Sequence, residues 1–92
     1  MEATRVKGTK KCNIMLYALS TCVWCKKTKA LLDELGVEYN YVYVDLLEME
    51  DMVEAKDTIK KMTNEITFPT IVFDEKSFIQ GFQPEEIKNR LK

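Results

Sequence analysis

Histidine is absent from this chain of 92 residues, and its absence removes whole classes of chemistry. Cys–His and Ser–His–Asp nucleophilic sites need an imidazole base, and many zinc sites use imidazole ligands. Proton transfer must therefore fall to Asp, Glu, Lys, Tyr or Cys side chains. We accordingly exclude the common hydrolytic mechanisms and any histidine-ligated metal.

Long apolar segments and flexible linkers are also missing. No stretch approaches the roughly 20 apolar residues that a membrane-spanning helix needs, so we expect no membrane partner. Residues 1–13 lack the apolar core of a secretory signal, which predicts a cytoplasmic location. Because the chain is short and has only three glycines and two prolines, we expect one domain over residues 11–92, preceded by a flexible N-terminal leader over residues 1–10.

The charge is nearly balanced, with 14 basic and 15 acidic residues and a net charge of −1. Proteins that bind nucleic acids usually carry a large positive excess, so we expect no nucleic-acid partner. Basic residues are nevertheless concentrated in residues 1–32, where seven Lys or Arg accompany a single Glu. This third of the chain could steer an acidic partner or stabilise a local anion. No unassigned apolar segment demands a second copy, so we expect a monomer.

Hydrophobic periodicity predicts alternating strands and helices from residue 11 onward. A continuous apolar run suits a central strand, and helical spacing follows it up to Gly36. The predicted elements are strands at 12–18, 37–44, 70–73 and 78–80, and helices at 23–35, 48–62 and 85–91. Two strands joined by a helix pair in parallel. The sequence therefore predicts an α/β domain of order βαβαββα, with a four-stranded mixed sheet flanked by helices.

Two cysteines three residues apart, Cys22 and Cys25, lie where the first strand meets the first helix. Residues at this spacing on a helix are neighbours, so a disulfide could close between them. Thr21 is the expected N-cap, and the helix N-terminus together with Lys26 should stabilise a thiolate at Cys22. We therefore expect Cys22 to attack and the more buried Cys25 to resolve.

Metal binding is the competing interpretation of these cysteines. A zinc site needs a second ligand pair, but only Cys12 remains, and we expect Cys12 to be a small buried apolar residue. An iron–sulfur cluster held between two chains through Cys22 stays open as an alternative. Metal content or visible absorbance of the purified protein would distinguish it. A CxxC at a strand–helix junction favours redox chemistry without a metal.

The chain resembles the glutaredoxin-like branch of the thioredoxin superfamily. The resemblance rests on Tyr17, on Thr21-Cys-Val-Trp-Cys25, on Thr67-Phe-Pro69 and on Gly81. It implies a thioredoxin-like fold, thiol–disulfide oxidoreductase activity and electron transport on two cysteines. It also implies a cis Phe68–Pro69 bond beside the CxxC motif, with the Phe68 backbone offered to the substrate. We also expect Trp24, the aromatic residue between the cysteines, to shape the substrate groove together with Gly81 and Phe82.

Two subfamilies compete within this resemblance. Glutathione-using glutaredoxins usually carry Pro-Tyr between the cysteines, a lysine where Leu19 stands, and Gly-Gly-x-Asp where residues 80–84 are Gln-Gly-Phe-Gln-Pro. The chain is more similar to NrdH-type redoxins, which carry Cys-Val-x-Cys and Gly-Phe-x-Pro. That similarity implies protein disulfide substrates such as ribonucleotide reductase, and recharging by thioredoxin reductase. A glutathione-dependent glutaredoxin is the alternative. We expect no cofactor, apart from glutathione as reductant in that alternative.

Overall fold

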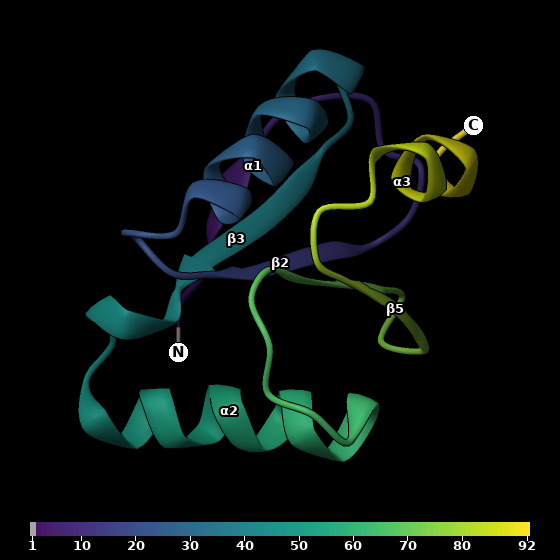
Figure 1. Ribbon diagram of the computed structural model, residues 1–92. Helices are drawn as coiled ribbons and strands as arrows, with labels where there is room; N and C mark the ends of the chain where they lie inside the picture. Colours follow the sequence, from purple (N-terminus) through teal and green to yellow (C-terminus); the bar gives the residue numbers. More distant parts are fainter. Residues whose placement is uncertain (1) are drawn as a thin grey trace.

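A mixed sheet of five strands organises the computed structural model, which describes residues 2–92 (Figure 1). The strand order across the sheet is β1-β3-β2-β4-β5. Helices α1 and α3 cover one face, and α2 covers the other. In chain order the elements are β1 (Thr4–Val6), β2 (Ile14–Ala18), α1 (Val23–Leu35), β3 (Tyr39–Tyr43), the 3-10 turn η1 (Val44–Leu46), α2 (Met49–Thr63), β4 (Thr70–Phe73), β5 (Ser77–Gln80) and α3 (Pro84–Arg90).

The predicted α/β architecture is confirmed, including the parallel pairing of β2 with β3. Strands β4 and β5 run antiparallel to their neighbours, as a hairpin requires. The predicted helix ends also hold: Gly36 and Asn64 both adopt the left-handed conformation that closes α1 and α2, and Pro84 opens α3. The sheet has five strands instead of the predicted four.

The extra strand, β1, lies within the residues predicted to form a leader. It pairs antiparallel with β3, with Thr4 opposite Tyr41. The chain then passes beside the end of α1, where the Thr9 N–H donates to the Gly36 carbonyl at 2.8 Å and the Glu38 N–H donates to the Thr9 carbonyl at 2.9 Å. A three-residue strand that contains Arg5 has no apolar alternation, so periodicity could not reveal it.

Two apolar cores lie on opposite faces of the sheet. Under α1 and α3 the largest buried side chains include Leu16, Leu32 and Phe73. On the other face α2 buries Ala55 and Ile59 against the sheet.

The spacing of apolar residues in 48–62 predicts an inward face for α2 made of Met49, Met52, Val53, Ile59 and Met62, and this prediction is wrong for two of them. Met49 and Val53 are 78% and 61% exposed, whereas Met52 and Met62 are partly buried beside the core. The small Ala55 lets the helix approach the sheet, and this contact fixes the rotation of α2 so that Val53 faces away.

No helix within residues 2–92 combines the length and the apolar character that crossing a membrane requires.

Candidate active site

Cys22 stands at the junction of the loop after β2 with helix α1. Its backbone is extended, and its Sγ accepts a hydrogen bond from the Cys25 N–H at 3.2 Å. Cys22 is therefore the N-cap of α1, and the prediction of Thr21 in that role was wrong. The helix itself begins at Val23, as predicted, and the Cys22 sulfur occupies the capping position. A backbone N–H and the positive end of α1 thus both face this sulfur, which suits negative charge.

Cys25 lies one turn further along α1 and is only 1% exposed. Its Sγ accepts a hydrogen bond from the Leu19 N–H at 3.5 Å. Burial, and next the hydrogen bond with Cys22, raise the pKa of the Cys25 thiol to about 12. Cys25 therefore keeps its proton at neutral pH, while the half-buried Cys22 presents its sulfur near the surface. This asymmetry is the arrangement expected of an attacking and a resolving thiol, although the two roles themselves stay predictions.

A shallow pocket of about 230 Å³ brings together the five residues predicted to bind substrate. The Phe68–Pro69 bond is cis, as the resemblance implied, and the Pro69 carbonyl accepts a hydrogen bond from the Gly81 N–H at 2.8 Å. The Trp24 and Phe82 rings stack with centroids 5.9 Å apart. Gly81 has φ +82°, so its backbone conformation suits glycine at this turn. The pocket is aromatic on two walls.

The basic residues of α1 are placed differently from one another. Lys26, predicted to influence the thiolate, is exposed, and its role stays a prediction. Lys27, the next basic residue of the helix, has its Nζ 4.8 Å from the centroid of the Trp24 ring. This cation–π contact holds a positive charge beside the aromatic wall.

Sequence reasoning also missed a polar connection beneath the thiols, the Ser20–Asp45 pair. The Asp45 carboxylate accepts hydrogen bonds from the Ser20 N–H at 2.8 Å and from the Ser20 hydroxyl at 2.5 Å. It thereby ties the loop that carries Leu19 to the segment following β3. Because parallel strands end at the same sheet edge, the predicted pairing of β2 with β3 already placed these two residues near each other. That signal could have found them.

We expect Asp45→Ala to lower the free energy of unfolding by about 1 kcal/mol at pH 7, because it removes two charge-assisted hydrogen bonds at an exposed site. The Ser20 hydroxyl, and next the Ser20 N–H, hold the pKa of Asp45 below its ordinary value of 3.8. The stabilisation is therefore present above that value and is lost as pH falls through the lower pKa of the folded protein. Thermal melts of both proteins at pH 7 and at about pH 2 check this.

The control is Ser20→Ala, which removes only the hydroxyl bond and should cost less than Asp45→Ala at pH 7. Melting temperatures of wild type and Asp45→Ala should converge at low pH. A constant difference at both pH values would contradict a role of the ionised carboxylate.

Metal-ligating side chains are not gathered at this site. Nowhere in residues 2–92 do three or more His, Cys, Asp or Glu side chains form a group that could hold a metal ion.

The chain is similar in sequence and in structure to proteins of one known family. The family model described as Glutaredoxin matches residues 14–79. The solved structure of Methanosarcina acetivorans methanoredoxin is 41% identical, with a TM-score of 0.92, and the match covers 99% of this chain and 95% of that one.

Two curated sequences add to this. Glutaredoxin 1 of Rickettsia prowazekii (strain Madrid E) is 39% identical over 61 residues, which is 66% of this chain and 61% of that protein. Human mitochondrial glutaredoxin-2 is 34% identical over 68 residues, which is 74% of this chain and 40% of that protein. The chain thus spans about two fifths to three fifths of the length of these two curated relatives. The fold of the chain is thioredoxin-like, as the sequence predicted.

Proposed function

The chain belongs to the glutaredoxin family, whose members are thiol–disulfide oxidoreductases, and from this premise we propose that it reduces protein disulfides through Cys22 and Cys25. The observation that carries the proposal is the pairing of two unlike sulfurs. One caps a helix near the surface, and the other is buried one turn away, with the Cys25 N–H donating to the Cys22 Sγ at 3.2 Å. Cys22, near the surface, can attack as a thiolate, whereas the buried and protonated Cys25 does not react until the mixed disulfide has formed.

The proposed reaction has two exchange steps. The Cys22 thiolate attacks one sulfur of the target disulfide, so that a mixed disulfide forms and the first target thiolate leaves. Cys25 then gives up its proton and attacks the Cys22 sulfur, which closes the Cys22–Cys25 bond and releases the second target thiolate. The departing thiolates can take up protons, including the one from Cys25. Two electrons pass to the target, and a reductase must return two to the protein.

The pocket beside Cys22 supports a protein as the preferred substrate. Trp24 lies between the two cysteines in the chain and stacks on Phe82, so the two rings offer apolar area to a substrate, and Lys27 adds one positive charge. Residues 80–84 provide no carboxylate in place of the Asp of the glutathione motif, and Leu19 stands where a lysine would bind a carboxylate. We therefore propose thioredoxin reductase as the electron donor and ribonucleotide reductase as a target.

The location follows from the chemistry. Free thiols that cycle through a disulfide need a reducing compartment, so we place the protein in the cytoplasm and expect it to act as a monomer with no bound cofactor.

Reduction of insulin disulfides with NADPH tests the donor. Thioredoxin reductase is supplied in one arm, and glutathione with glutathione reductase in the other. We expect turnover with thioredoxin reductase and little with glutathione, because the groups that would hold the tripeptide are missing. Absorbance of NADPH at 340 nm gives the rate in both arms.

The Cys22→Ser variant is the blank for each arm. Turnover with glutathione alone would overturn the donor assignment while leaving disulfide reduction intact. No NADPH consumption in either arm, with a folded protein, would count against the proposed function itself.

A further inference from the structure

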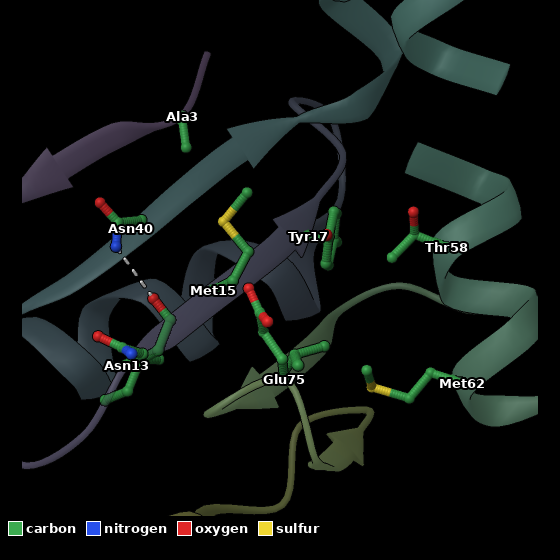
Figure 2. Close-up of a pocket in the computed structure, with 10 residues that line it drawn as sticks. Ala3, Asn13, Met15, Tyr17, Asn40, Thr58, Met62 and Glu75 are labelled. Carbon is green, nitrogen blue, oxygen red and sulfur yellow. Dashed lines mark hydrogen bonds between the residues drawn. The ribbon is translucent and has the colours of Figure 1, made fainter. Parts of the chain in front are cut away.

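A second cavity lies on the face of the sheet that α2 covers, and the thiol chemistry does not use it (Figure 2). Its volume is about 570 Å³, within the range of small-molecule sites. Met15 and Tyr17 line it from β2, Asn40 from β3 and Met62 from α2, while Glu75 reaches over it from the β4–β5 turn. The pocket beside the thiols shares none of these residues.

Tyr17 is the first sign that this cavity takes a ligand. The side chain is only 6% exposed, yet its hydroxyl forms no hydrogen bond to any residue in 2–92. No fully enclosed polar side-chain atom lacks a partner in that range, so the Tyr17 oxygen keeps access to the cavity space. An accessible hydroxyl on a buried ring that lines a cavity is a ready hydrogen-bonding group for a molecule inside it.

The charge of the lining is the second sign. Glu75 is the only ionisable acid or base among the residues that line the cavity, apart from Tyr17 itself. Burial first, and then the nearby carboxylates of Glu54 and Glu75, raise the pKa of Tyr17, so negative charge faces its hydroxyl. The cavity therefore favours a cation over an anion.

The position of Glu75 is fixed by its neighbour in the turn. The Asp74 carboxylate accepts a hydrogen bond from the Asn13 N–H at 2.9 Å, and the Asp74 N–H donates to the Asn13 carbonyl at 2.8 Å. These bonds attach the β4–β5 turn to the start of β2. The backbone that carries Glu75 is thus fixed beside the cavity that this residue lines.

The apolar walls indicate the apolar part of the cationic ligand. Met15 and Met62 present thioethers from β2 and from α2. Val72 lines the same cavity from β4. Thioether sulfurs make favourable contacts with aromatic rings, and flexible methionines adapt to their shape. An aromatic ring therefore suits the space between the two methionines.

We propose that this cavity binds a small aromatic amine, with its ring between Met15 and Met62 and its ammonium group donating hydrogen bonds to both the Glu75 carboxylate and the Tyr17 hydroxyl oxygen. The Tyr17 ring adds a face that attracts the cation. The site is independent of Cys22 and Cys25, so it does not rest on the proposed redox function.

Phenethylammonium is the probe, followed by proton–carbon NMR of the reduced protein with labelled methionine methyl groups. Met15 and Met62 report on the cavity, whereas the exposed Met49 serves as an internal reference. We expect the methyl signals of Met15 and Met62 to shift saturably, with a Kd on the order of 1 mM for so small a ligand, while Met49 stays unchanged.

Three variants and two analogues sharpen the test. Glu75→Gln should weaken binding about tenfold and Tyr17→Phe roughly threefold. Glu50→Gln removes an equal charge from the start of α2, outside the cavity, and should change nothing. The anion 3-phenylpropanoate should not bind, and neutral 2-phenylethanol should bind more weakly than the amine.

Four results would overturn the proposal: no saturable shift of Met15 and Met62, an equal shift of Met49, equal binding of 3-phenylpropanoate, or an unchanged Kd in Glu75→Gln. Glu75 is exposed in a turn, so its variant should fold even if Tyr17→Phe does not. Because no readout depends on the thiols, failure here would leave the proposed function untouched.

Discussion

The Cys22→Ser variant is expected to reduce disulfides no faster than the uncatalysed background, with either electron donor. A serine hydroxyl stays protonated at neutral pH and cannot displace a thiolate from a disulfide. The helix N-terminus and the Cys25 N–H would then face a neutral oxygen instead of a sulfur that can carry charge. The insulin assay gives the rate, and circular dichroism checks that the variant is folded.

Cys25→Ser should behave differently, because it leaves the attacking sulfur in place. The first exchange still proceeds, but no thiol remains to attack the Cys22 sulfur, so the mixed disulfide accumulates. Mass spectrometry of the intact variant, after mixing with a disulfide-containing peptide, should show one peptide bound per chain. A reductant should release it.

Cys12→Ser is the matched control for both variants. Cys12 is half-buried just before β2, where Asp74 and Arg90 are the charges that act on it, and burial raises its pKa. We expect full activity from this variant. Residual turnover in Cys22→Ser would show that the nucleophile is assigned wrongly. Full turnover of Cys25→Ser with glutathione would favour the glutathione-dependent alternative, because free glutathione can resolve a mixed disulfide.

Gly8→Ala should lower the free energy of unfolding by about 2–3 kcal/mol. A Cβ atom at this position would lie 2.6 Å from the Gly36 carbonyl oxygen and 2.7 Å from that of Val37. Both oxygens belong to the backbone between the end of α1 and the start of β3, so neither can move aside without a cost in free energy. The chain would have to move away and lose the Thr9 bond to Gly36. A thermal melt should show a fall in Tm of roughly 10 °C.

Lys7→Ala is the comparison for this substitution, since Lys7 is exposed and adjacent in the chain. Its expected effect is within about 0.5 kcal/mol of zero. Equal melting temperatures for the two variants would mean that residues 7–9 do not contribute to the folded domain as the contacts indicate.

The sequence predicted the helices and strands in which apolar residues recur at regular spacing, and it predicted the CxxC motif as the reactive site. The bounds of α1 and β4 were exact, and Cys22, Cys25 and Pro69 were singled out before their geometry was known. Those signals are local, because an apolar run, a helical stripe or a CxxC spacing lies within one short segment.

What the sequence could not predict depends on contacts between distant segments. β1 is a strand only because β3 offers it an edge. The rotation of α2, which exposes Met49, is decided by how Ala55 packs on the sheet. The second cavity likewise forms only when β2, β3 and α2 are in place.

The pairing of β1 with β3 has a further consequence for the behaviour of the protein at high concentration. β3 reads Tyr-Asn-Tyr-Val-Tyr, an uncharged segment of high β-propensity, and its free edge would template pairing with other chains. β1 covers that edge with only three residues, and Arg5 within it and Lys7 beyond it place positive charge along the new border. The first few residues of the chain thus act as a gatekeeper against aggregation, on the side of the sheet that lies furthest from β5.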